Sequence, residues 1–313
     1  MTVTHADVQA AGERVAGHVL RTPILEISPG LIFKLEQVQR SGSFKVRGAF
    51  NRILSAGSLP PAGVIAASGG NHGLAVAYAA RALGVRAEIF VPTVASPVKV
   101  AGLRALGAEI TQTGAIYSAA AEAAAKRAAE TGALPVHAYD QPEVIAGQGT
   151  LALELMEQAP GVDTVLVAVG GGGLASGVSL GLREDVKLVA VEPELIPALH
   201  RALLAGHPVP IEVSGVGADA LGATQVGDLA FGILSGAGSE SVLSGAGVES
   251  VLVSDEAIIN ARRRLWSEHR LAVEHAGAAA YAALLSGAYR PADGERVAVV
   301  LCGSNTDPAT LTG

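Results

Sequence analysis

Short apolar runs alternate with longer amphipathic stretches along most of the chain. The apolar runs predict buried strands at 64–67, 87–91, 136–138, 164–169, 187–191 and 297–301. Alanine-rich stretches without internal proline predict helices at 73–83, 97–106, 116–131 and 150–158. Alternation of this kind is typical of parallel sheets whose two faces are covered by helices, so we expect an α/β protein.

The alternating units fall into two groups. The first group occupies roughly 60–140, and the units after about 145 form a second, larger sheet that we expect the N-terminal segment to join. The 313 residues suffice for two domains of roughly 150 residues each. We expect a large domain made of 1–52 and 142–313 and a small, mobile domain made of 53–141.

A nine-residue tandem repeat interrupts this pattern. SGAGSESVL at 235–243 is followed by SGAGVESVL at 244–252. The repeat is too short and too solitary for a solenoid, and Gly/Ser-rich insertions cost little in loops. We therefore expect a duplicated surface loop.

Composition excludes several classes of partner. No run of about 18 apolar residues occurs, so no membrane span is expected. The net charge of −7 argues against a nucleic-acid partner. Cys302 is the single cysteine, which excludes an internal disulfide and fits a cytoplasmic protein, and the N-terminus lacks a signal-peptide layout.

Two segments contain candidate binding groups in the first third of the chain. In GSFKVRGA, Phe44 and Lys45 precede helix-forming residues, and an apolar wall beside a lysine suits a Schiff base, although a solvated surface lysine fits the spacing as well. In SGGNHG, Ser68, Asn71 and the amides opened by glycine could bind a carboxylate or phosphate. The alternatives are a βα turn capped by Asn71 and a structural His72.

Two further candidates follow predicted strands near the middle and the end of the chain. Four consecutive glycines, Gly170, Gly171, Gly172 and Gly173, precede Leu174, and several converging amides make a phosphate site. The spacing is neither that of a dinucleotide fingerprint nor that of a P-loop. Cys302 ends the last strand, where side chains point into the ligand crevice, although a buried structural cysteine is the common alternative.

In this order the segments resemble the serine/threonine dehydratase branch of the fold type II pyridoxal-phosphate enzymes, which are similar to tryptophan synthase β. The resemblance covers nearly the whole chain and is carried by GSFKVRGA, SGGNHG, GQGT (147–150), VGGGGL, VEPE (191–194) and CGSN. It implies a two-domain α/β fold, pyridoxal 5′-phosphate as cofactor, an amino-acid substrate and a homodimer.

The resemblance also implies residue roles. Lys45 binds the cofactor aldehyde and later acts as acid and base, Phe44 lies against the cofactor, and Asn71 binds the ring hydroxyl. Gly170–Leu174 hold the phosphate, Cys302 meets the ring nitrogen, and Glu274 lies near the cofactor. Ser68, Gly69, Asn71 and His72 bind the substrate. A neutral thiol makes the ring a weaker electron sink, which suits β-elimination of L-threonine or L-serine to a 2-oxo acid and ammonia.

The chain departs from the family pattern at two sites. Serine racemases carry a serine where this chain has Gly69, so we expect little racemisation. The family's divalent-metal site pairs a glutamate with an aspartate a few residues later, and here Glu192 is followed by no such carboxylate at 196–198, so no metal is expected. The chain also ends soon after CGSN, and we expect no feedback inhibition by isoleucine.

Three alternatives stay open at this point. One is another enzyme of the same fold, such as a cysteine or threonine synthase, although the phosphate loop and the absence of an extra basic cluster argue against both. Another is a dehydratase for a different β-hydroxy amino acid, such as 3-hydroxyaspartate. The last is a catalytically silent cofactor-binding protein, whose sign, loss of Lys45, is absent.

Overall fold

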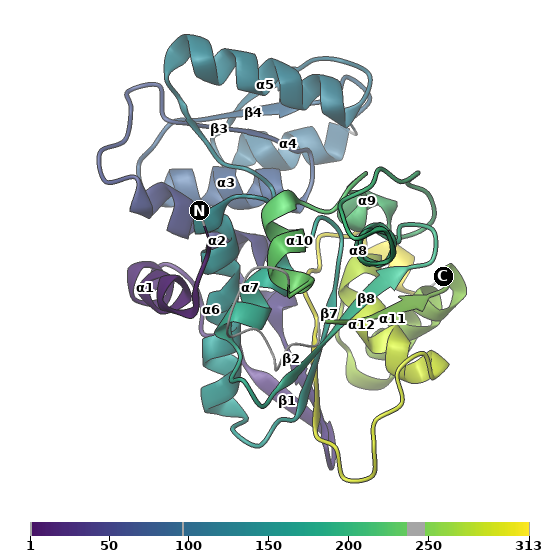
Figure 1. Ribbon diagram of the computed structural model, residues 1–313. Coiled ribbons are helices and arrows are strands. Elements are labelled where there is room, and N and C mark those ends of the chain that lie inside the picture. Colours follow the sequence, from purple (N-terminus) through teal and green to yellow (C-terminus); the bar gives the residue numbers. More distant parts are fainter. Residues whose placement is uncertain (1, 96, 237–247, 313) are drawn as a thin grey trace.

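Two sheets, one above the other in Figure 1, organise the chain. The computed structural model describes residues 2–95, 97–236 and 248–312. The larger sheet has the strand order β1-β2-β10-β7-β8-β9. Its strands are β1 (Ile24–Ser28), β2 (Leu31–Lys34), β7 (Thr164–Ala168), β8 (Lys187–Pro193), β9 (Glu249–Val253) and β10 (Val297–Val300).

The smaller sheet lies within the middle third of the chain and is entirely parallel. Its order is β5-β4-β3-β6, formed by β3 (Val64–Ala67), β4 (Ala87–Val91), β5 (Glu109–Gln112) and β6 (Leu134–Pro135). The larger sheet is parallel apart from the antiparallel β1–β2 pair at one edge. That pair confirms the expectation that the N-terminal segment joins the second sheet.

Helices cover the sheets and connect them. Around the smaller sheet lie α3 (Asn71–Ala82), α4 (Pro97–Ala105) and α5 (Tyr117–Thr131). Around the larger sheet lie α1 (His5–Val15), α2 (Lys45–Ser55), α6 (Pro142–Gln158), α7 (Gly173–Gly181), α8 (Ala198–Ala205), α9 (Ala218–Leu221), α10 (Asp228–Leu234), α11 (Asp255–His269) and α12 (His275–Ser286). Short 3-10 helices occur at η1 (Glu36–Val38), η2 (Arg40–Gly42) and η4 (Pro308–Leu311). No helix of the described ranges is long and apolar enough to cross a membrane.

The core of the larger sheet is made of aliphatic strand residues. Every residue of β7 and of β10 is buried, as expected for strands sandwiched between helices. Ala278, Ala279 and Ala282 of α12 are fully buried. Their small side chains let this helix approach the sheet closely. A fold made this way leaves the carboxyl ends of the parallel strands free to form a site.

Two sequence predictions need correction. The strand predicted at 136–138 is instead β6 at Leu134–Pro135, and after Val136 the backbone turns because the His137 ring accepts amide hydrogens from Tyr139 and Asp140. The helix predicted to begin at 150 begins at Pro142, with Gly147 and Gly149 inside it. A Cβ at Gly147 would lie 2.7 Å from Gly48 Cα, so this glycine permits close helix packing and does not end the helix.

The tandem repeat falls partly on residues that the structure describes. Its positions 237–247 lie outside the described residues. At its end, Glu249–Val253 is strand β9, paired parallel with β8. The prediction of a surface loop is therefore wrong for 249–252, because the apolar run Val251–Val253, rich in β-branched valine, suits a strand that pairs with β8.

Candidate active site

Lys45 is the first residue of α2, and the loop before it is hydrogen-bonded to the residues that follow β10. Phe44 N donates to Cys302 O at 3.1 Å, and Ser43 forms a bridge with Gly303. The Lys45 amine donates to Ala138 O at 2.6 Å and lies 5.2 Å from the centre of the Phe44 ring. Burial lowers the pKa of Lys45 to about 8, so a sizeable fraction of the amine is neutral and nucleophilic at neutral pH.

The four glycines form the turn between β7 and α7. Gly172 has a φ of +93°, a conformation that side-chain-bearing residues rarely adopt. A Cβ at Gly171 would collide with the Tyr139 ring, and a Cβ at Gly173 would collide with Tyr139 O. These glycines let Tyr139 pack on the turn, and the turn and the start of α7 line the cavity that also contains Lys45, where backbone amides at a helix N-terminus suit a phosphate.

Cys302 and Glu274 lie on the far side of the same space. The Cys302 thiol donates to Ala276 O at 3.5 Å, and burial raises its pKa far above the usual range, so the thiol stays neutral. Burial also raises the pKa of Glu274 to about 7, opposed by the hydrogen bond from Asn71. The Cys302 thiol thus carries no negative charge at neutral pH, whereas Glu274 is partly ionised there.

Asn71 connects this side to the first turn of α3. Its Nδ2 donates to Glu274 Oε1 at 2.6 Å, and its Oδ1 accepts from Asn305 Nδ2 at 2.6 Å. Asn305 Nδ2 also donates to Ser41 O at 2.8 Å, in the loop that leads to Lys45. Asn71 is therefore held in one orientation by side chains from two separate segments, and one of these, Asn305, also contacts the loop before Lys45.

The remaining substrate-binding candidates lie around the end of β3. Ser68 Oγ accepts from Gly70 N at 3.2 Å, and Gly69 has open space where a Cβ would stand. His72 is 5% exposed, and its Nε2 lies 2.9 Å from Val136 O inside the smaller unit. Burial lowers the pKa of His72 to about 3, which keeps the ring neutral. Of these candidates, Asn71 lines the cavity beside Lys45.

A narrow cavity collects the predicted cofactor residues. Its lining includes Phe44, Lys45, Asn71, Gly170, Gly171, Gly172, Gly173, Leu174, Glu274 and Cys302. Sequence reasoning missed Tyr139, Ala220 and Leu221, which line it too. Tyr139 follows the end of a parallel strand, and residues at that position commonly point into a ligand crevice. Its position in the sequence could therefore have identified it as a candidate site residue.

The donor set fits pyridoxal phosphate. The site offers a partly neutral amine for the aldehyde, glycine amides for the phosphate, an amide for the ring hydroxyl and a neutral thiol for the ring nitrogen. The cavity measures ≈ 40 Å³, well below the roughly 300–1,000 Å³ typical of ligand pockets. Part of the wall therefore has to move for the cofactor to fit. The ring of Tyr139, which lies against Gly171 on a loop, is one such part.

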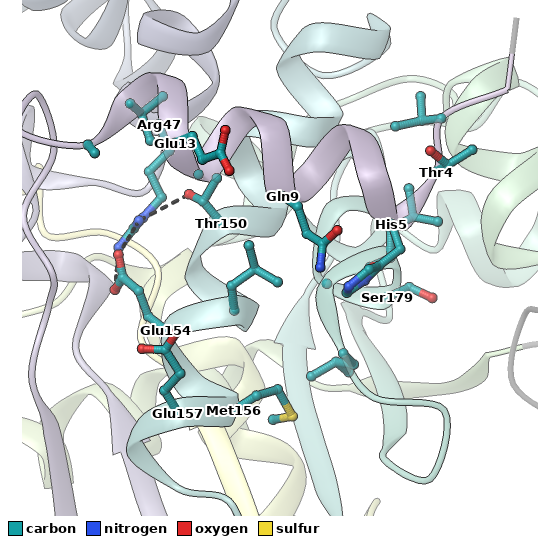
Figure 2. Close-up of a pocket in the computed structure, with 18 of the residues that line it drawn as sticks. Thr4, His5, Gln9, Glu13, Arg47, Thr150, Glu154, Met156, Glu157 and Ser179 are labelled. Carbon is teal, nitrogen blue, oxygen red and sulfur yellow. Dashed lines mark hydrogen bonds and ion pairs between the residues drawn. The ribbon is translucent and has the colours of Figure 1, made fainter.

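A buried ionic cluster supports α2 from behind. Arg47 pairs with Glu36 at 2.8 Å and with Glu154 at 2.7 Å, while Lys34 pairs with Glu154 at 2.7 Å. Figure 2 shows Arg47, Thr150 and Glu154 at one end of a separate cavity of ≈ 1200 Å³ beside α1. Because Arg47 lies two residues from Lys45, the cluster fixes the start of the helix that presents the amine.

Glu192, the remaining candidate for a metal ligand, has a structural role here. Its two carboxylate oxygens accept from Leu199 N at 2.7 Å and from His200 N at 2.8 Å, in the first turn of α8. Within residues 2–95, 97–236 and 248–312, no group of three His, Cys, Asp or Glu side chains is arranged to hold a metal ion. The glutamate is therefore used to satisfy backbone amides.

Comparisons with known proteins agree with this geometry. The family model described as pyridoxal-phosphate dependent enzyme matches residues 15–303. An L-threonine ammonia-lyase of Thermotoga maritima is 36% identical over 97% of this chain and 76% of its own length. A beta-hydroxyaspartate dehydratase of Paracoccus denitrificans is 35% identical over 97% of this chain and 96% of its own length.

Among solved structures, maize serine racemase superimposes with a TM-score of 0.90 at 30% identity, covering 99% of this chain and 96% of its own. Dehydratases and a racemase are thus all similar to the chain at comparable identity. The matched range includes every cofactor residue named above, from Phe44 to Cys302. The chain belongs to the family of pyridoxal-phosphate dependent enzymes and is a lyase of fold type II.

Proposed function

We propose that this lyase is a dehydratase that converts L-threonine and/or L-serine to the corresponding 2-oxo acid and ammonia. The observation that carries the proposal is the position of the Lys45 amine, 2.6 Å from Ala138 O, between the glycine turn and the neutral Cys302 thiol. The sequence similarity to a threonine ammonia-lyase supports the same substrate class.

The residues divide the chemistry among themselves. Pyridoxal phosphate, when bound, withdraws electrons from the substrate Cα. Lys45, with a pKa of about 8, takes the α-proton and then, as an acid, gives a proton to the β-hydroxyl, which leaves as water. Cys302, being neutral, donates no proton to the ring nitrogen and so favours loss of a leaving group over a long-lived carbanion. The enamine product then hydrolyses to the 2-oxo acid and ammonia.

The test measures 2-oxo acid released from L-threonine and L-serine with cofactor and no added metal. Borohydride reduction should fix the cofactor on the peptide that contains Lys45, and Lys45→Ala should lose both the label and turnover. Lys126→Ala, an exposed lysine on α5, is the matched control. A label on another lysine would overturn the assignment. Turnover of 3-hydroxyaspartate alone would keep the reaction and replace the substrate.

The proposal includes three further properties: motion of the small domain, location in the cytoplasm and assembly as a dimer. Residues 53–141 move as a unit relative to 1–52 and 142–313, since one face of the smaller sheet has a core, around Ile65 and Phe90, that is made only of residues of this unit. The protein is a cytoplasmic homodimer, which the family resemblance and the single, buried cysteine support. Sedimentation equilibrium measures the assembly state, and a monomer at micromolar concentration would contradict it.

A further inference from the structure

A second pocket adjoins the Lys45 cavity in the smaller unit. It measures ≈ 390 Å³ and lies between α5 and the segment 135–141. Its lining comes from β3, from α5 and from that segment: Ile65, Ala66, Ala67, Tyr117, Ala121, Ala124, Ala125, Pro135, Val136, His137, Ala138, Tyr139, Asp140 and Gln141. Tyr139 lines both cavities and is the wall between them.

Two contacts place the second pocket near the groups that react with the substrate. Lys45 donates to the carbonyl of Ala138, and Ala138 lines the second pocket. Ala67, also in its lining, directly precedes the Ser68–Gly69–Gly70 turn proposed for the substrate carboxylate. A substrate held between that turn and Lys45 therefore has the second pocket as the neighbouring space for its side chain once Tyr139 turns aside.

The lining of the second pocket is suited to uncharged groups. Alanines, Ile65 and Val136 make up most of the wall, and no lysine or arginine is among the described residues that line it. The one acidic side chain, Asp140, accepts hydrogen bonds from the amides of Asp228, Leu229 and Ala230 at 3.0–3.2 Å. Burial lowers the pKa of His137, the histidine in this lining, so a second carboxylate in this space would lose hydration without gaining a cation, which is costly.

The pocket is larger than a methyl group needs. A cavity of about 150 Å³ lined by apolar side chains holds a benzene molecule. The ≈ 390 Å³ here, part of it open to solvent, thus has room for an aromatic ring. Tyr117 and Tyr139 supply aromatic edges for such a ring.

We propose that this pocket receives the group carried on the substrate Cβ, and that the enzyme accepts β-hydroxy amino acids with uncharged side chains up to an aromatic ring but discriminates against 3-hydroxyaspartate. The inference rests on the proposed dehydratase function and names its substrate class. Ala121, half-buried on α5 and facing the pocket, is the specificity-determining position.

The experiment compares kcat/KM for L-threonine, 3-phenylserine and 3-hydroxyaspartate. The wild type should favour each uncharged substrate over 3-hydroxyaspartate by at least about tenfold. Ala121→Phe, which fills the pocket, should lower kcat/KM for phenylserine by about tenfold or more and leave threonine within about threefold. Ala121→Arg should raise the ratio for 3-hydroxyaspartate. Ala129→Phe and Ala129→Arg, on the same helix but outside the pocket and exposed, are the matched controls.

A binding measurement separates this proposal from the reaction itself. L-phenylalanine and L-aspartate carry no β-hydroxyl, and their dissociation constants follow from calorimetric titration of the holoenzyme. L-phenylalanine should bind at least about tenfold more tightly than L-aspartate, and Ala121→Phe should remove that difference. Tighter binding of L-aspartate, or turnover of 3-hydroxyaspartate equal to that of threonine, would overturn the pocket assignment. Absence of turnover with every β-hydroxy amino acid would instead overturn the dehydratase function.

Discussion

Gly69 lies where the chain leaves β3, and the space beside it is open. A Cβ there would meet Val91 Cγ1 at 3.7 Å and Ala95 Cβ at 3.9 Å, which are ordinary contacts. A serine therefore fits without displacing the backbone. Because the family resemblance puts the second proton-exchanging hydroxyl of the racemases at this position, we expect its absence to favour elimination over racemisation in the wild type.

We predict that Gly69→Ser gains conversion of L-serine to D-serine, measured by chiral chromatography beside pyruvate release. The wild type should form little D-serine relative to pyruvate. Gly70→Ser is the matched control, because a Cβ at Gly70 also has room, with Asp219 O at 3.9 Å. D-serine formed by the wild type as fast as pyruvate, or equally by both variants, would contradict the role assigned to position 69.

His72 makes a second residue-scale prediction, on stability against pH. Its pKa is lowered to about 3 in the folded protein, against about 6.5 in an unfolded chain. The unfolded chain therefore binds more protons between those values, and the stabilisation present above pH 6.5 is lost as the pH falls. His72→Gln can still donate to Val136 O but does not titrate. The free energy of unfolding, from urea titrations between pH 7 and 4, should fall less steeply in the variant, and parallel curves would contradict this.

At the scale of elements, the cluster of Arg47, Glu36, Glu154 and Lys34 joins α2 to β2, η1 and α6. Arg47 and Glu36 have fully buried side chains, so each depends on the other for compensation of its charge. Removing one partner of a buried ion pair leaves the other charge buried and unpaired, which typically costs about 3–5 kcal/mol of stability. The location of Lys45 at the start of α2 makes this cost relevant to the site.

We predict that Arg47→Met lowers the free energy of unfolding by about 3–5 kcal/mol, measured by denaturant titration. Arg86→Met is the control, since Arg86 pairs with Glu109 across β4 and β5 at the surface and should cost at most about 1 kcal/mol. Equal losses of unfolding free energy in the two variants would show that the buried cluster contributes no more to stability than a surface ion pair.

Element patterns in the sequence predicted strands of both sheets but missed β1, β2, β5 and β9 and some boundaries. Apolar runs identify β3, β4, β7, β8 and β10 because strands covered on both faces are made mostly of apolar residues. The limits of β6 and of α6 were not predicted, for two different reasons. At β6 the ring of His137 accepts from nearby amides and turns the backbone, and at α6 the glycines lie against Gly48 and Gly177 O of distant segments. Neither kind of contact leaves a periodic signal.

At the scale of the whole molecule, the site is assembled from segments that the sequence keeps far apart. Lys45, Asn71, the glycine turn and Cys302 could be predicted because each lies in a local motif. Tyr139, Leu221 and the relay from Asn305 through Asn71 to Glu274 could not, because each depends on how the smaller unit is seated on the larger one. The position of the smaller unit on the larger one therefore determines which residues line the cavity.

An ion pair bridges the two units beside the Lys45 cavity. Lys99 of α4 pairs with Asp219 of α9, the short helix whose Ala220 and Leu221 line the cavity. Both side chains are more than a third exposed, so the pair contributes only about 0.2–1 kcal/mol and weakens with salt. If 53–141 closes as a unit on the substrate, opening has to break this contact.

We predict that Asp219→Asn raises KM by about 1.4- to 5-fold with kcat unchanged, because weakening the bridge favours the open arrangement before substrate binds. The ratio of the two KM values should fall toward one as salt rises, since screening removes the pair from the wild type as well. Asp185→Asn breaks an exposed pair with Arg183 inside the larger unit and should leave KM unchanged. A salt-independent rise in KM, or a lower kcat, would show that Asp219 acts on the cavity through α9 and not through the bridge.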